Sequence, residues 1–155
     1  MSELSIIKYP DPILLKQTEH VKDVCKPSVQ KLIADMLETM EKNNGVGLAA
    51  PQIGKSLRLC VIRLDDKTYV LANPKITYKS WLKDICEEGC LSFPGKFIPI
   101  QRHKKVRVKA LDEKGEEFTL KAEGLLARAL QHEIDHLDGK VFIEKEIKIK
   151  KRSKK

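Results

Sequence analysis

Hydrophobic positions in the first third of the chain predict an amphipathic helix over Ser28–Asn44. Its apolar residues recur at three- and four-residue spacing, which is typical of a helix with one buried face, and they are Leu32, Ile33, Met36, Leu37 and Met40. Ser28 could cap the start of this helix. Asn43, Asn44 and Gly45 tolerate the left-handed conformation at a helix C-terminus, so we expect the helix to end where a glycine-rich segment begins.

Short runs of β-forming residues follow and predict several strands. They cover Leu57–Leu64, Tyr69–Ala72, Ile76–Tyr78, Val106–Leu111 and Glu117–Lys121. Turn residues separate neighbouring runs, as at Asp65-Asp66 and at Asp112–Gly115, which favours antiparallel hairpins.

A second helical pattern occupies Gly124–Asp138, and Gly139 is placed to end it. The order of one helix, many strands and one late helix favours an α+β fold, with mostly antiparallel strands packed around the late helix. No repeat or low-complexity linker divides the chain. We expect one domain over residues 1–144 and a basic tail over 145–155.

Composition narrows the class of protein. A chain of 155 residues with 41% hydrophobic residues can bury one core. The chain has neither a signal-like N-terminus nor an apolar run of about eighteen residues, so we expect a soluble cytoplasmic protein with no membrane contact. Four cysteines are then expected to be reduced, Cys60 and Cys25 as core residues.

The net charge of +8 is concentrated at the C-terminus, where residues 145–155 hold seven Lys or Arg and one Glu. Such a tail is either a solvated terminus or a weak contact with ribosomal or other RNA. No aromatic residue is interleaved with these charges, so sequence-specific recognition, including that of DNA, is not expected.

The late helix carries the strongest chemical signal, the sequence His132-Glu133-Ile134-Asp135-His136. His132 and His136 lie one helical turn apart and can direct two imidazoles to one metal ion. Glu133, rotated by roughly 100° from His132, can reach a water at the metal without being a ligand, which suits a proton carrier. Alone, the pattern also fits a solvated amphipathic helix.

A catalytic metal usually takes three protein ligands, and no histidine follows His136. The best upstream candidate is Cys90, in a segment bounded by glycine and proline that we expect to form a loop, Glu87–Gly95. A thiolate suits zinc, iron(II) and similar metals. The alternative is a small buried core residue. Cys86 is either a second thiol near the site or a wall of a pocket, and we leave it out of the ligand set.

A third segment, Gly45–Gly54, is rich in small residues, so another backbone can approach it closely. Gln52 can offer a neutral amide donor there. The segment is either part of a binding site or a structural turn, and it lacks the Lys-Ser/Thr of a phosphate loop.

Three segments together resemble the motifs of the peptide deformylase family: Gly45–Gln52, Glu88–Ser92 and Gln131–His136. Their order and spacing also match, and the resemblance extends to about Ile143. The resemblance implies that the protein is a metal-dependent hydrolase that removes the N-formyl group from formylmethionyl nascent peptides and releases formate. One departure is the short Lys-rich end, since many bacterial members continue into a longer C-terminal helix that can contact the ribosome.

The resemblance also implies roles for individual residues. The metal ligands fall on Cys90, His132 and His136, and the general acid/base on Glu133. The side-chain amide of Gln52 and the backbone N–H of Leu91 are implied to stabilise the oxyanion, and the main chain at Gly47 and Gly89 to hold the peptide extended. Methionine needs an apolar pocket, for which the candidate walls are Leu125, Ala129 and Val46.

The resemblance further implies one divalent metal, most often iron(II), with zinc or nickel as substitutes. Two other readings stay open from the sequence. A metallopeptidase would require a third ligand after the helix, and an inactive basic protein that binds RNA would not need all the candidate site residues.

Overall fold

The computed structural model describes residues 2–147. Five strands form an antiparallel sheet in the order β1 (Gly47–Ala49), β2 (Leu59–Leu64), β3 (Lys67–Lys79), β6 (Lys105–Leu111) and β7 (Glu117–Glu123). Two further strands, β4 (Lys83–Cys90) and β5 (Phe93–His103), form a separate two-stranded sheet. The helices are α1 (Pro27–Lys42) and α2 (Gly124–Leu137), with 3₁₀ turns at Pro12–Leu15, Ala50–Ile53 and Phe142–Lys145.

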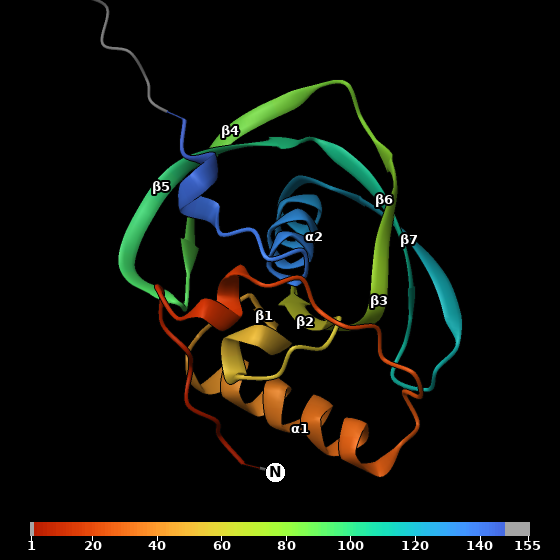
Figure 1. The fold of residues 1–155 in the computed structure, drawn as a ribbon. Helices are drawn as coiled ribbons and strands as arrows, with labels where there is room; N and C mark the ends of the chain where they lie inside the picture. Colours follow the sequence, from red (N-terminus) through yellow and green to blue (C-terminus); the bar gives the residue numbers. More distant parts are fainter. Residues whose placement is uncertain (1, 148–155) are drawn as a thin grey trace, which may run out of the picture.

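Helix α2 lies at the centre of the molecule, and both groups of strands curve around it (Figure 1). Its buried side chains Leu130, Ile134 and Leu137 pack in one cluster with residues of the five-stranded sheet such as Leu71 and Val108. Helix α1 packs against the outside of β1 and β2. The predicted α+β arrangement of mostly antiparallel strands around the late helix is therefore confirmed.

Helix α1 begins one residue before the predicted position and is not capped by Ser28. The N-cap is Lys26, and Pro27 occupies the first turn. Proline fits the first turn because its fixed φ suits a helix and the missing N–H has no partner to lose there. At the other end, Asn44 adopts a φ of 55°, in agreement with the predicted left-handed stop.

Two predicted strands are one strand in the structure. Strand β3 runs through both Tyr69–Ala72 and Ile76–Tyr78, with irregular register between them. Asn73, at a φ of 52°, and the proline after it produced the break in the hydrophobic pattern. The Asp65-Asp66 turn was predicted correctly, and both residues have positive φ.

The prediction of a loop over Glu87–Gly95 is wrong on both sides of Leu91 and Ser92, because the flanking residues belong to strands. Cys90 ends β4, a short turn at Leu91 and Ser92 follows, and β5 begins at Phe93. Most side chains of β4 are exposed, so the strand lacks the alternation by which a half-buried strand is recognised. The pairing of β4 with β5 forms the wall of the site described below.

Three sequence expectations concern the cysteines and the tail. Cys60 is buried, as predicted, whereas Cys25 is exposed and the core assignment was wrong. All four cysteines are free thiols. Residues 148–155 of the basic tail lie outside the described residues, and Glu146 still bridges to Ile100 of β5. None of the helices in residues 2–147 is long and apolar enough to cross a membrane.

Candidate metal centre

Three side chains from two elements converge beside α2. His132 and His136, 8% and 1% exposed, lie one turn apart on the helix. Cys90 is the last residue of β4. The ligand atoms of these three residues all lie within 4.8 Å of one another, and Cys90 Sγ is 3.3 Å from His136 Nε2. The structure therefore brings together the three residues predicted as ligands.

The chemistry of this donor set fits a divalent metal ion. One thiolate and two imidazoles match the three-ligand arrangement of catalytic sites, which leaves a coordination position open. Burial, followed by repulsion from His132, lowers the pKa of His136 and so keeps its imidazole neutral, as a ligand requires. Burial also lowers the pKa of His132, but hydrogen bonds to Cys90 and Glu88 outweigh it and raise the pKa to about 10. The groups around His132 thus favour a positive charge at this position.

Glu88 orients His132 from behind. A carboxylate only accepts hydrogen bonds, so His132 Nδ1, 2.9 Å from Glu88 Oε1, is the donor, and Nε2 is left for the metal. Arg102 of β5 donates to both Glu88 oxygens at 2.9 Å, and Arg128 of α2 donates to Oε2 at 2.6 Å. Burial raises the pKa of Glu88, but the bond from Arg102 and then that from His132 outweigh it and hold the pKa well below its usual range.

Gln52 directs its side-chain amide toward the sulfur of Cys90. The backbone N–H of Ala49 donates to Gln52 Oε1 at 2.9 Å, which leaves the NH₂ group directed inward. Gln52 Nε2 lies 3.1 Å from Ser92 Oγ and 3.5 Å from Cys90 Sγ. The Ser92 hydroxyl in turn donates to the carbonyl of Ile7 at 2.7 Å, so the N-terminal segment helps to hold this side of the site.

Glu133 is a buried carboxylate with an unused oxygen. It is 5% exposed, and its Oε1 has no hydrogen-bond partner among the described residues. Burial raises its pKa to about 7, where a carboxyl group can both take and give up a proton near neutral pH. The carboxylate packs so closely against Gly47 that a Cβ at position 47 would collide with it.

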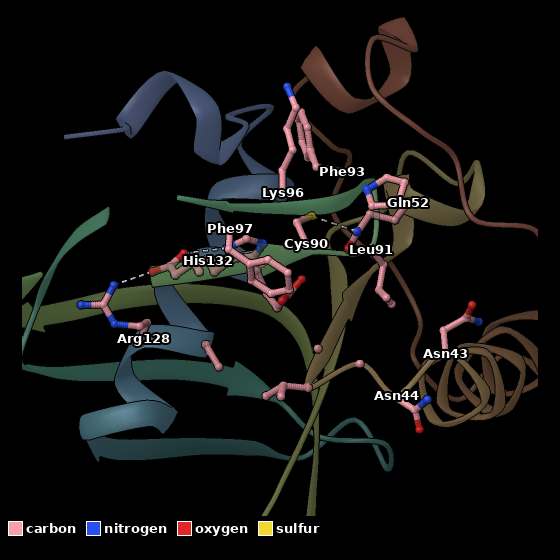
Figure 2. A pocket seen from close by; sticks show the side chains of 18 of the residues that line it. Asn43, Asn44, Gln52, Cys90, Leu91, Phe93, Lys96, Phe97, Arg128 and His132 are labelled. Atoms are coloured by element: carbon pink, nitrogen blue, oxygen red, sulfur yellow. Dashed lines mark hydrogen bonds and ion pairs between the residues drawn. The ribbon is translucent and has the colours of Figure 1, made fainter. Parts of the chain in front are cut away.

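A cleft of about 580 Å³ opens beside these groups. All but one of the predicted site residues line it, the exception being the buried His136: Val46, Gly47, Gln52, Gly89, Cys90, Leu91, Leu125, Ala129, His132 and Glu133. Figure 2 shows Gln52, Cys90 and His132 gathered around the same part of the cleft from three different elements. Cys86 is exposed and does not line the cleft.

Several residues of the site were not singled out from the sequence. Arg128 precedes His132 by one turn of α2, so helical spacing could have placed it on the same face. Arg102 and Phe97 come from β5, which the hydrophobic pattern did not predict. Phe97, 67% exposed, packs over Gly89, where an added Cβ would lie 2.8 Å from its ring.

Comparisons with known proteins agree with this geometry. A family model described as polypeptide deformylase matches residues 3–153. The peptide deformylase of Thermodesulfovibrio yellowstonii is 48% identical over 150 residues, which cover 94% of this chain and 90% of that protein. Peptide deformylase 1 of Clostridium perfringens is 46% identical over 143 residues, or 91% of this chain and 97% of that one.

Solved structures give the same result. The peptide deformylase of Ehrlichia chaffeensis in complex with actinonin superposes with a TM-score of 0.92 at 44% identity, covering 96% of this chain and 91% of that chain. The Thermotoga maritima peptide deformylase gives 0.93 at 37% identity, covering 96% and 100%. The chain belongs to the polypeptide deformylase family, as a metal-dependent hydrolase that removes the N-formyl group from the N-terminal formylmethionine of nascent polypeptides and releases formate.

Proposed function

We propose that Cys90, His132 and His136 hold the catalytic metal of this deformylase and that Glu133, Gln52 and the Leu91 N–H carry the reaction. The observation that supports this most strongly is the convergence of the three ligand atoms within 4.8 Å of one another, beside a cleft that Gln52, Leu91 and Glu133 line. When bound, a divalent metal supplies Lewis acidity, which lowers the pKa of water and polarises a carbonyl group.

Glu133 acts as the proton carrier. It takes a proton from the water whose oxygen adds to the formyl carbon, and it returns that proton to the methionine nitrogen as the carbon–nitrogen bond breaks. The second proton of the water leaves the new carboxyl group and is taken up by the amine, so that formate and a protonated amino terminus result and atoms and charges balance. The raised pKa of about 7 suits both transfers, since the group changes protonation state with little driving force either way.

Gln52 and Leu91 stabilise the negative charge that develops on the formyl oxygen. The Gln52 amide is suited to this role because Ala49 holds its carbonyl oxygen and leaves the NH₂ group facing the site. The Leu91 N–H follows Cys90 directly and belongs to the cleft lining. Loss of one such donor costs on the order of a hundredfold or more in rate.

The substrate peptide lies extended between Gly47 and Gly89. Within residues 2–147, strand β1 is the edge of the five-stranded sheet and β4 pairs only with β5, so each glycine sits on a strand with one free edge. Added strands bind through such edges. The methionine side chain enters an apolar part of the cleft bounded by Val46, Leu125 and Ala129.

Iron(II) is the metal we propose as native, with zinc or nickel able to replace it, because a mixed thiolate and imidazole site suits all three. The cytoplasm, where nascent chains are made, is the compartment implied. A weak contact of the tail over 145–155 with ribosomal RNA remains a proposal, and residues 148–155 lie outside the described part of the chain.

Formate release from a formyl-Met-Ala-Ser peptide tests the assignment. Anaerobically purified protein is assayed with and without a chelator, with unformylated peptide as the control, and its metal is identified by elemental analysis. We expect chelator-sensitive formate release, no peptide-bond cleavage and about one iron per chain. Full activity in a protein with zinc alone and no iron would overturn the choice of metal.

A further inference from the structure

The strands β3, β6 and β7 have an outer face that points away from α2 (Figure 1). On β6, Val106, Val108 and Ala110 are buried, and the residues that alternate with them are exposed. The exposed positions of β6 are Lys105, Arg107 and Lys109. The core-facing side of this strand is thus apolar, and the other side carries three exposed cations followed by the half-buried Leu111.

Neighbouring strands continue this pattern in register. Lys121 of β7 lies directly opposite Arg107, and Lys75 of β3 lies directly opposite Lys109. Residues directly opposite each other in an antiparallel pair share a face of the sheet. We call the following five residues the basic face: Lys75, Lys105, Arg107, Lys109 and Lys121.

The basic face has few compensating charges. Glu117 pairs with Lys109 at 2.6 Å and Glu123 with Lys105 at 3.6 Å. Five cations against these two carboxylates leave a net charge of +3 on the face. Like charges directly opposite each other destabilise a sheet, and both Arg107–Lys121 and Lys75–Lys109 are such pairs. Contact with a polyanion would relieve that repulsion.

Two exposed aromatic side chains accompany the cations. Tyr78 of β3 is 50% exposed and lies opposite Arg107, whose guanidinium carbon is 5.7 Å from the centre of the ring. A hollow of about 340 Å³ is lined in part by Tyr78, Arg107 and Lys121. Trp81, just after β3, is 94% exposed.

Trp81 lies beside the basic face through its neighbours in the chain. The N–H of Ser80 donates to the carbonyl of Lys105 at 2.8 Å, and the N–H of Lys104 donates to the carbonyl of Leu82 at 3.0 Å. These bonds hold both flanks of Trp81 against the start of β6. Trp81, whose side chain has almost no intramolecular cover, therefore follows a backbone segment that is held beside Lys105.

We propose that the basic face, with Tyr78 and Trp81, binds single-stranded RNA. Lysine and arginine neutralise phosphates, and exposed aromatic rings on a sheet stack with unpaired bases. The inference is separate from the deformylase site, because none of the five basic residues lines the catalytic cleft. RNA bound to this face would leave the cleft open to the nascent peptide. The ribosome, from which that peptide emerges, itself contains RNA.

Trp81 makes the proposal testable in the intact chain, because it is the only tryptophan. Titration with an oligouridylate of about 12 nucleotides should quench its fluorescence as bases stack on the indole. Heparin, which has charge but no bases, should compete for the face without quenching. A blue shift with anionic phosphatidylserine vesicles, without quenching by RNA, would instead indicate a membrane surface and overturn the proposal.

A charge-reversal variant with a matched control tests the residues. Lys75→Glu with Lys121→Glu turns both like-charge pairs into opposite-charge pairs, so the fold should gain rather than lose stability. The control, Lys22→Glu with Lys55→Glu, changes the net charge equally at two exposed lysines outside the basic face.

We expect the first variant to weaken RNA binding by about tenfold or more at low salt. Loss of two phosphate contacts should also reduce the slope of log K against log salt by about 1.4. Formate release from a short formyl peptide should stay unchanged in both double variants. Equal weakening by the control would show that only net charge matters and would overturn the proposal, as would RNA binding that leaves Trp81 fluorescence unchanged.

Discussion

His132 donates its Nδ1–H to Glu88 at 2.9 Å, and Arg102 donates two hydrogen bonds to the same carboxylate. Glu88 is only 7% exposed, so its charge depends on these partners rather than on water. The pair therefore links the orientation of one proposed ligand to a buried ion network that joins β4, β5 and α2. Metal affinity and fold stability should respond together when the pair is broken.

Glu88→Gln is expected to weaken metal binding by about 10- to 100-fold, because the imidazole loses the carboxylate that fixes its tautomer and direction. The free energy of unfolding should also fall by about 3 kcal/mol, since Arg102 and Arg128 lose the buried carboxylate that they share and keep only Asp135 and Asp84 as partners. Chelator competition and chemical denaturation measure the two effects.

Glu87→Gln is the matched control for this prediction. Glu87 is the preceding residue of β4, and it is exposed. It should change neither quantity measurably. Equal losses in the two variants would mean that general charge on β4, rather than the Glu88–His132 contact, sets metal affinity.

Glu133→Gln is expected to keep the metal and reduce turnover by a factor of about a thousand or more, because a neutral amide cannot carry the proton. Metal stoichiometry and formate release are measured on the same preparation. Turnover equal to that of the unchanged protein would remove Glu133 from the proton-carrier role.

The same variant should stabilise the metal-free protein in a pH-dependent way. Burial raises the pKa of Glu133 to about 7, so the folded state binds this proton more tightly than the unfolded state. The part of the free energy of unfolding that this proton contributes in the wild-type protein is then lost as the pH rises from about 4.5 to 7. Glu133→Gln should be more stable by roughly 1–3 kcal/mol above pH 7, with little difference near pH 4. A constant difference across this range would contradict the assignment.

The candidate site was predictable from the sequence to the extent that its geometry is local. His132, Glu133 and His136 are related by helical periodicity alone, so their spacing sufficed. The Glu88–Arg102 contact instead depends on the pairing of β4 with β5, which neither strand signals by hydrophobic alternation. Arg128 was not singled out from the sequence, since nothing in α2 itself reveals the Glu88 carboxylate that helps to hold this side chain at 8% exposure.

In the fold, too, local features were predicted from the sequence and non-local pairing was not. Helix α2 was predicted to within one residue because a regular apolar face and Gly139 define its length. The turn at Asn73 and Pro74 split β3 into two apparent strands, since the sequence does not reveal that pairing with β6 resumes beyond it. Non-local register is thus what the hydrophobic pattern lacked in both cases.

Cys90→Ser is expected to weaken metal binding by at least about tenfold, because an alcohol is a harder and much less acidic ligand than a thiol. Cys86→Ser is the matched control. Both cysteines belong to β4, but Cys86 is exposed and lies outside the cleft lining. Metal titration of both variants should therefore separate them. Unchanged metal content and identity in Cys90→Ser would exclude this residue from the ligand set.

Gly47→Ala tests whether the glycine-rich segment sets the position of the proton carrier. The added methyl group would overlap the Glu133 carboxylate, which is buried. We expect kcat to fall by about tenfold or more while the metal stays bound, because misplacement of a catalytic group by about 1 Å costs on this scale. Gly89→Ala is the informative comparison, since its methyl group meets the ring of Phe97, which is exposed and free to move. That variant should mainly raise KM for the formyl peptide, and the reverse pattern would show that a methyl group at position 47 disturbs substrate binding rather than the placement of Glu133.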